Sequence, residues 1–408
     1  MVSRRQLLLG AAGLAGGSAV AAGSGALAAQ AYKNGFAEAE ALGHLTVARS
    51  KRPWSGEHQG GIESPAQSHA KFIALTLKSG ITREDMLRWM LLLTEDIEAL
   101  ANGHAVLADP SPELMIGAAN LSVTVGFGPS LFQKLKLENQ IPHGFAELPE
   151  FKIDRLRSDY SGGDVLIQVG ADDLQILTQA TRALLRDSEA FGHVKWVQSG
   201  FTNAVGSNRP GVTQRNLMGQ VDGTDNPEFG SENFANQVWI TEGPNWAIGG
   251  TQMALRRIKM NLETWDSLGR RQKEQTIGRN LHNGAPLNGL EERDPIDFNA
   301  VDENGLKVIP EFAHIRRASA KNMDELFYRR PFNYQDLSTE KDAKPGQFES
   351  GLLWTAYAKN LSKQYVPVQE RLANFDLLNK WTTPVGSATF AIARGINPGE
   401  ILAEELFA

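Results

Sequence analysis

The sequence predicts an α+β protein built from two tandem ferredoxin-like units, each with the element order βαββαβ and an antiparallel sheet. Three observations support this fold class. Strand-like apolar runs alternate with amphipathic helical segments, the same order recurs in both halves, and a polar, glycine-containing linker at 200–216 separates the halves. Because 408 residues favour two domains, we expect an N-terminal domain over 29–205 and a C-terminal domain over 206–408.

In the N-terminal half, hydrophobic periodicity defines four strands and two helices. The strands are predicted at 71–78, 121–127, 164–171 and 194–197. Apolar residues alternate in the second of these, LSVTVGF, so we expect this strand to have one buried face. Thr82 is expected to cap a helix with apolar positions at i, i+3, i+4 and i+7 spacing, namely Met86, Trp89, Met90, Leu93 and Ile97. A second helix is predicted over 174–186.

The C-terminal half repeats this order with a longer middle section. Strands are predicted at 253–260, 311–318, 351–358 and 388–395, and helices at 262–277 and 361–381. The section 278–350 is richer in Arg, Asn and Pro than its counterpart. We interpret the two halves as a duplicated unit whose second copy became specialised, although an α+β protein can also reach this order by chance.

The first 28 residues are excluded from the fold because they have the features of an export signal. Arg4 and Arg5 precede a short, glycine-broken apolar run, which ends in an A-x-A cleavage site at 26–28. These features predict a twin-arginine signal peptide rather than a membrane span. We therefore expect a periplasmic or otherwise exported protein, carried by a pathway that accepts folded proteins, often with a cofactor.

Composition excludes several classes of function. Removing Arg4 and Arg5 changes the formal charge from -6 to -8 (-6 minus two positive charges), which disfavours nucleic acid and anionic membranes as partners. No later segment approaches 18 unbroken apolar residues, so no membrane span is predicted. The absence of cysteine excludes disulfides, thiolate metal sites, iron–sulfur clusters and a cysteine nucleophile. The motifs of serine hydrolases, P-loop ATPases and Rossmann dehydrogenases are also missing.

Three segments of the second half carry residues suited to chemistry. The loop LMGQVDGTDNP (217–227) presents Asp222 between two glycines, although a simple turn would have the same composition. His314 lies in PEFAHIRRASAKN, and Arg329 follows in LFYRRPFNY. A histidine in a strand-like run is commonly structural. As a metal ligand, however, a single histidine favours haem over zinc, which needs three or four protein ligands.

Together, these segments resemble those of the dye-decolourising (DyP-type) haem peroxidases. GQVDG at 219–223 matches the G-x-x-D-G motif of that family, HIRRA at 314–318 resembles its proximal ligand segment, and RRPFNY at 329–334 resembles its distal arginine segment. With the export signal, the chain is similar to the exported bacterial branch that includes deferrochelatases. Further similar stretches lie at 56–67, 124–132, 277–287 and 375–391.

The resemblance implies one haem b per chain, bound in the C-terminal unit. His314 would be the proximal iron ligand, Asp222 the distal acid–base group, and Arg329 the residue that stabilises O–O cleavage. The flanking glycines would let the loop backbone approach the porphyrin. Gly223, Thr224 and Asp225 match the stretch that contacts haem in that family.

The segment after His314 departs from the family pattern. Ser319, Ala320 and Lys321 stand where relatives often carry Asn-Pro-Arg, so Lys321 would pair a haem propionate only as a point charge. Arg279 is a second candidate for a propionate, or a surface arginine. Asp376 is our candidate for the carboxylate that accepts the second N–H of the proximal histidine.

We therefore predict a peroxidase that reduces hydrogen peroxide and oxidises organic donors, such as dyes, phenols and porphyrins, in one-electron steps. Trp354, Tyr357 and Tyr334 are candidates for an electron relay, or core residues. One alternative is a haem-binding, iron-releasing protein of an iron-uptake system with little peroxidase turnover. Another is a cofactor-free dimeric binding protein. Asp222 and Arg329 favour the peroxidase, because a carrier does not need them. A homodimer is expected in any of these cases.

Overall fold

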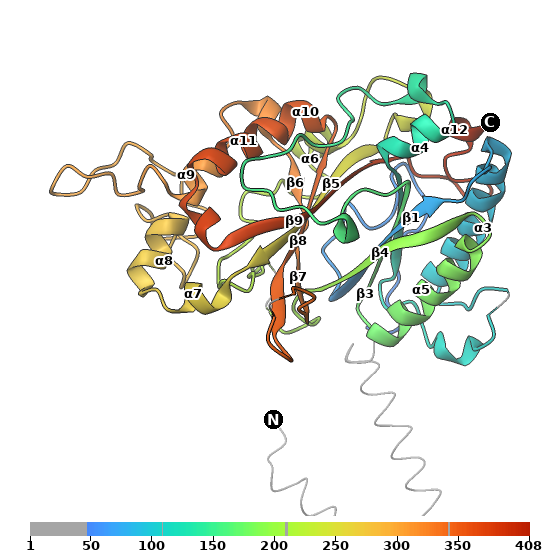
Figure 1. Cartoon of the computed structure of the whole chain (residues 1–408), viewed down its shortest axis with the longest axis horizontal. Helices are drawn as coiled ribbons and strands as arrows, with labels where there is room; N and C mark the ends of the chain where they lie inside the picture. Colours follow the sequence, from blue (N-terminus) through green and yellow to red (C-terminus); the bar gives the residue numbers. More distant parts are fainter. Residues whose placement is uncertain (1–46, 108, 209–210, 342) are drawn as a thin grey trace, which may run out of the picture. The chain divides into compact units, whose positions relative to one another are not determined.

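The computed structural model describes residues 47–107, 109–208, 211–341 and 343–408, and Figure 1 shows how their elements are arranged. The predicted signal peptide at 1–28 lies outside the described residues. Residues 48–408 pack together as one unit. Among the helices of the described residues, none is long and apolar enough to cross a membrane.

The four strands predicted in the N-terminal half are confirmed, and they pair antiparallel in the order β2-β3-β1-β4. Their bounds are β1 His69–Leu77, β2 Ser122–Phe127, β3 Val165–Ala171 and β4 Gly192–Phe201. The two predicted helices are α3 (Arg83–Ala101) and α5 (Leu174–Ser188). Apolar side chains of both helices share one core with side chains of β1, β2 and β3.

Helix α3 begins as the sequence predicts. The Thr82 hydroxyl accepts a hydrogen bond from the Asp85 N–H, and the Asp85 carboxylate accepts one from the Thr82 N–H, which together form a capping box. The five predicted apolar positions of α3 are all buried. The expectation of a single buried face for β2 is wrong, because both faces of this strand are covered. On its second face the Thr124 hydroxyl donates to the Gly60 carbonyl, and Gly126 packs directly against Phe390.

The C-terminal half forms an antiparallel sheet with the order β9-β5-β8-β7, and a two-residue strand, β6, also pairs with β8. The bounds are β5 Thr251–Met260, β6 Tyr328–Arg329, β7 Phe332–Leu337, β8 Phe348–Ala358 and β9 Thr382–Ile392. Three of the four predicted strands are confirmed. The predicted strand at 311–318 is wrong, because His314–Ala318 forms a short helix, α9, whose first turn is closed by hydrogen bonds to the Ala313 carbonyl.

The two long helices predicted in the C-terminal half are each interrupted. The first is divided into α7 (Leu262–Asp266) and α8 (Arg270–Ile277), with Gly269 at the start of α8. The second is divided into α10 (Leu361–Gln364) and α11 (Val366–Phe375). Pro367 in the first turn of α11 lacks an N–H and so starts a new helix. The remaining helices are α4 Pro129–Lys134, α6 Glu232–Val238 and α12 Glu404–Phe407.

The two four-stranded arrangements join into one ring of strands. β2 pairs with β9 at Gly126 and Phe127, and β4 pairs with β7 only at Phe201. Together with the β5–β8 pairing, these contacts close the ring, so the halves do not form the two separate sheets that we expected. The α+β class is confirmed. Helices α7, α8, α9 and α11 gather at the C-terminal half, away from α3 and α5 (Figure 1).

Candidate active site

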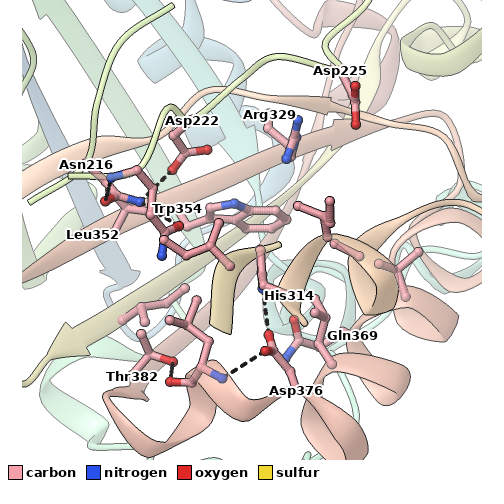
Figure 2. Close-up of a pocket in the computed structure, with 18 of the residues that line it drawn as sticks. Asn216, Asp222, Asp225, His314, Arg329, Leu352, Trp354, Gln369, Asp376 and Thr382 are labelled. Carbon is pink, nitrogen blue, oxygen red and sulfur yellow. Dashed lines mark hydrogen bonds and ion pairs between the residues drawn. The ribbon is translucent and has the colours of Figure 1, made fainter. Parts of the chain in front are cut away.

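One cavity brings together the three residues that the sequence singled out. Asp222, His314 and Arg329 all line it, and its empty space, including the opening to solvent, is about 1550 Å³ (Figure 2). Its walls are largely apolar and include Met218, Ile258, Met260, Ile277, Leu352, Trp354, Val368 and Leu372. The cavity is therefore suited to a largely apolar group that is contacted by a few polar side chains.

The loop that carries Asp222 is a tight turn held by its own backbone. The Asp222 N–H donates to the Gln214 carbonyl over 2.9 Å. Gly219 and Gly223 have φ values of 83° and 125°, which residues with a Cβ rarely adopt. The need for two glycines around one carboxylate thus has a geometric cause, because the chain turns sharply on both sides of Asp222.

A neighbouring amide orients the Asp222 carboxylate. Asn216 Nδ2 donates to Asp222 Oδ2 over 3.3 Å, as Figure 2 shows. Asn216 Oδ1 in turn accepts from the Met218 N–H over 3.0 Å, which fixes the amide in this orientation. Asn216 also lines the cavity. The sequence analysis missed this residue, and its place directly before the glycine-bounded loop is the only signal that could have indicated it.

Arg329 lies on the same side of the cavity as Asp222. It belongs to β6, where it pairs with Ala356 of β8. Figure 2 shows its side chain near Asp222 and Asp225, across the cavity from His314. No hydrogen bond or ion pair of its guanidinium group is found within the described part of the chain, so its donors remain available to a group bound in the cavity.

His314 and Asp376 form the opposite wall. His314 is the first residue of α9, and its Nδ1 lies 2.6 Å from Asp376 Oδ2 (Figure 2). Asp376 is only 8% exposed, and its second oxygen accepts from the Leu378 N–H over 2.9 Å. Burial lowers the pKa of His314, but the Asp376 carboxylate outweighs this effect and raises that pKa above its ordinary value.

The contact with Asp376 fixes the tautomer of His314. Because a carboxylate can only accept, Nδ1 carries the hydrogen and the neutral ring keeps the lone pair on Nε2. No hydrogen bond of Nε2 occurs among the residues that the structure describes. A histidine with one nitrogen held by a buried carboxylate and the other free is the usual arrangement of a metal-ligating imidazole.

Most of the other predicted cofactor residues line the same cavity, namely Gly223, Thr224, Asp225, Ser319 and Ala320. Lys321 is exposed and lies outside the lining, and its backbone N–H donates to Glu325 Oε2 over 2.9 Å. Thr224 is held by a 2.9 Å hydrogen bond from its hydroxyl to Glu292 Oε1. The expected Lys321–propionate contact is thus without support from the cavity lining.

Arg279, which the sequence left open as a site or surface residue, is 7% exposed and lines the cavity. Its NH1 donates to the carbonyls of Gly284 and Glu292, each over 2.8 Å, and its NH2 lies 3.8 Å from Asp225 Oδ1. Burial lowers the pKa of Arg279, which still remains a cation because free arginine has so high a pKa. The structure therefore provides one buried cation at the cavity wall.

The three candidates for an electron relay have different surroundings. Trp354 lines the cavity, and its ring centroid lies 5.3 Å from that of Tyr365. Tyr357 is fully buried in the core and donates to Gln168 Oε1 over 2.8 Å. Tyr334 is also fully buried and donates to Glu349 Oε1 over 3.1 Å. Only Trp354 of the three contacts the cavity.

The chain is similar to known proteins over most of its length. The model of the N-terminal domain of Dyp-type peroxidases matches residues 59–202, and the model of the C-terminal domain matches residues 213–397. A dye-decolorizing peroxidase of Thermobifida fusca is 34% identical, with 99% of this chain and 97% of the relative aligned. A deferrochelatase of Shigella flexneri is 31% identical, with 97% and 94% aligned. The crystal structure of a DyP-type peroxidase from Cellulomonas bogoriensis has a TM-score of 0.84 and 43% identity, covering 88% of this chain and 99% of that chain.

Proposed function

The chain belongs to the Dyp-type peroxidase family, and we propose that its cavity binds one haem b and reduces hydrogen peroxide while organic donors are oxidised. One observation carries this proposal: across a single cavity, the His314 imidazole faces an acid and a guanidinium, and neither Nε2 nor that guanidinium has a partner among the described residues. The haem, when bound, supplies the redox-active iron at which peroxide accepts two electrons.

Residues on both sides of the cavity are suited to hold that group. His314 Nε2 would be the proximal ligand, and Asp376 would hold the ring and increase its basicity as a ligand. Gly223, Thr224 and Asp225 of the acid loop, with Ser319 and Ala320 after α9, would contact the macrocycle. We assign the propionate contact to the buried Arg279 rather than to the exposed Lys321.

Asp222 would act as the acid–base group. Its carboxylate would take a proton from one oxygen of the peroxide and return that proton to the other oxygen, which would then leave as water. The hydrogen bond from Asn216 reaches Oδ2, and the other carboxylate oxygen, Oδ1, has no hydrogen-bond partner in the described part of the chain. This oxygen is the one that we assign to the proton transfer.

Arg329 would stabilise the negative charge that develops on the departing oxygen. An arginine is charged at any physiological pH, and a fixed donor in a site that excludes water is effective for this purpose. The guanidinium of Arg329 has no carboxylate partner among the described residues, so its charge is not already neutralised. An arginine already paired with a carboxylate would stabilise the charge of the transition state less.

The donor class is that of dyes and phenols, with Trp354 as the residue that passes electrons from bulky donors at the cavity wall.

The second candidate function is iron release from haem, as in the deferrochelatases that the chain resembles. We further propose that the protein is exported by the twin-arginine pathway and forms a homodimer. We also propose that it consists of two ferredoxin-like units with a domain boundary near residues 205–206. The Arg4–Arg5 signal supports the export pathway, and the equivalent strand orders of the two halves support the domain boundary and the two units.

Absorbance spectra of the haem-loaded protein test this function. We expect the Soret band of the wild type to shift rapidly after one equivalent of hydrogen peroxide. The same shift should be slower by about 100-fold or more in Asp222→Asn and Arg329→Leu. A Soret band that peroxide only bleaches, equally in all three proteins, would contradict the peroxidase. If free porphyrin appeared and the Soret band did not respond to peroxide, iron release would be favoured instead.

A further inference from the structure

We propose that Asn226 is a positioning residue that fixes the acid loop against Arg329. Asp222 and Arg329 must act on the same peroxide molecule, yet they come from segments far apart in the sequence. The Asn226 carboxamide joins these segments by two hydrogen bonds to the backbone of Arg329 itself. This inference rests on the proposed function and deepens it, because it names the contact that sets the spacing of the two distal groups.

The contact has the geometry of a single-residue strand pairing. Asn226 Nδ2 donates to the Arg329 carbonyl over 2.7 Å, and the Arg329 N–H donates to Asn226 Oδ1 over 3.1 Å. β6 has only two residues and pairs with β8 on its other side, through Arg329 and Ala356. The side chain of Asn226 therefore satisfies the backbone groups of Arg329 that would otherwise lie at the edge of the sheet.

Asn226 is rigidly connected to Asp222. Its N–H donates to the Gly223 carbonyl over 3.0 Å and closes a turn directly after the acid. The Asp222 N–H is in turn held by the Gln214 carbonyl over 2.9 Å. A displacement of Asn226 relative to Arg329 would consequently move the acid loop as a unit, and with it the Asp222 carboxylate.

An amide is the side chain that this contact requires. Asn and Gln carry a donor and an acceptor on one planar amide, and, unlike histidine, they do not change their charge with pH. The spacing of Asp222 and Arg329 would thus stay constant while the acid gives and takes its proton. This contact also explains the asparagine of the Thr-Asp-Asn-Pro extension after the G-x-x-D-G motif, because the proposed catalytic roles do not involve it.

Two further amides support the same junction but do not bind Arg329. Gln214 Nε2 donates to the Pro331 carbonyl over 3.0 Å, and Asn333 Nδ2 donates to the Arg215 carbonyl over 3.2 Å. Both connect the chain before the acid loop with the chain after Arg329. Asn226 does not line the cavity, so it cannot act on a bound group directly. Its effect on the reaction must pass through the position of Arg329 and Asp222.

The first test is hydrogen exchange in the folded protein, with and without haem. In Asn226→Ala the Arg329 N–H loses its acceptor, so the peptide containing Arg329 should exchange faster, while peptides of β8 stay protected. Asn288→Ala is the matched control, because Asn288 Nδ2 also donates to a backbone carbonyl, that of Asp297 over 2.6 Å, outside the cavity lining. Unchanged exchange at Arg329 in Asn226→Ala would overturn the proposal, whether or not the protein is a peroxidase.

The second test measures the rate of the peroxide-induced Soret shift. We expect Asn226→Ala to slow it by about 10- to 100-fold, the effect of a misplacement of about 1 Å, with unchanged haem content and unchanged KM for the organic donor. In an Arg329→Leu background, Asn226→Ala should cause a smaller loss than in the wild type, because the part of its effect that passes through Arg329 is already absent. If the two substitutions slowed the Soret shift additively, or if Asn226→Ala slowed it no more than Asn288→Ala, Asn226 would have only a structural role and the proposal would be wrong. Failure of the proposed function would instead leave the wild type itself unresponsive to peroxide.

Discussion

The two walls of the cavity hold their functional side chains by different means. On the distal wall, Asp222 and Arg329 are positioned by neutral amides, through the Asn216–carboxylate contact and the Asn226–backbone contacts. On the proximal wall, His314 depends on one buried carboxylate, Asp376, at 2.6 Å. Neutral contacts fix geometry without altering charge, whereas the carboxylate also sets the electronic character of the imidazole.

This difference predicts two separable kinds of defect. Changes on the proximal wall should affect retention of haem, because the ligand and its partner are both there. Changes on the distal wall should leave haem in place and affect only the reaction with peroxide.

His314→Ala should abolish stable haem binding, because the chain offers no second imidazole among the residues that line the cavity. The ratio of Soret to protein absorbance after purification measures this loss. Arg329→Leu is the control on the opposite wall and should retain haem. If His314→Ala kept full haem and full peroxide reactivity, the assignment of the proximal wall would be wrong.

Asp376→Asn should weaken haem affinity or peroxide reactivity by about 10- to 100-fold, the usual effect of removing the carboxylate behind a ligating histidine. The amide keeps the shape of the side chain but removes its charge, and His314 then loses the partner that raises its pKa. Haem transfer to an acceptor protein gives the affinity. An affinity and reactivity equal to those of the wild type would show that the carboxylate has no such influence.

Arg330→Met should destabilise the fold near the distal wall by about 3 kcal/mol, because buried acceptors are left without donors. The Arg330 guanidinium is 1% exposed and donates to the carbonyls of Ile62, Ser64 and Pro65. Arg52 also donates to the Pro65 carbonyl but is half-buried, so Arg52→Met should cost less. Urea unfolding measures both free energies, and an equal or reversed order would contradict this account.

Asp96→Asn, far from either wall, should leave haem and peroxide reactivity unchanged but alter the pH dependence of stability. Burial and the Asp187 carboxyl raise the pKa of Asp96 to about 8. Because its folded pKa is raised, the folded state binds an extra proton, and its stability falls as pH rises from about 4 through about 8. Unfolding midpoints across this interval should decline less in the variant. If the unfolding midpoints of the variant and the wild type declined equally, Asp96 would not bind this extra proton.

The sequence predicted the buried strands and α3 well, because apolar periodicity and a capping box are local signals. It missed β6 and β7, because Arg329, Arg330 and Pro331 interrupt the apolar pattern and these strands are stabilised mainly by pairing with β8. It also assigned the segment of His314 to a strand, although its apolar residues pack as a helix turn against Leu287, Ile296 and Phe298. Tertiary contacts decided both outcomes.

The candidate site shows the same limit. Asp222, His314 and Arg329 were identified by their similarity to a known family, and their meeting in one cavity depends on a fold that local patterns do not specify. Asn226 and Arg329 are 103 residues apart, and His314 and Asp376 are 62 apart. The exposure of Lys321 and the burial of Arg279 were likewise beyond prediction, because both depend on how distant segments cover the cavity.

A crystal structure of the haem-loaded protein with cyanide would test the central claim most directly. The account predicts iron bound by His314 Nε2 on one face, and cyanide on the other face within hydrogen-bond distance of Asp222 or Arg329. Iron bound by a residue other than His314, or cyanide on a face that neither Asp222 nor Arg329 approaches, would contradict it.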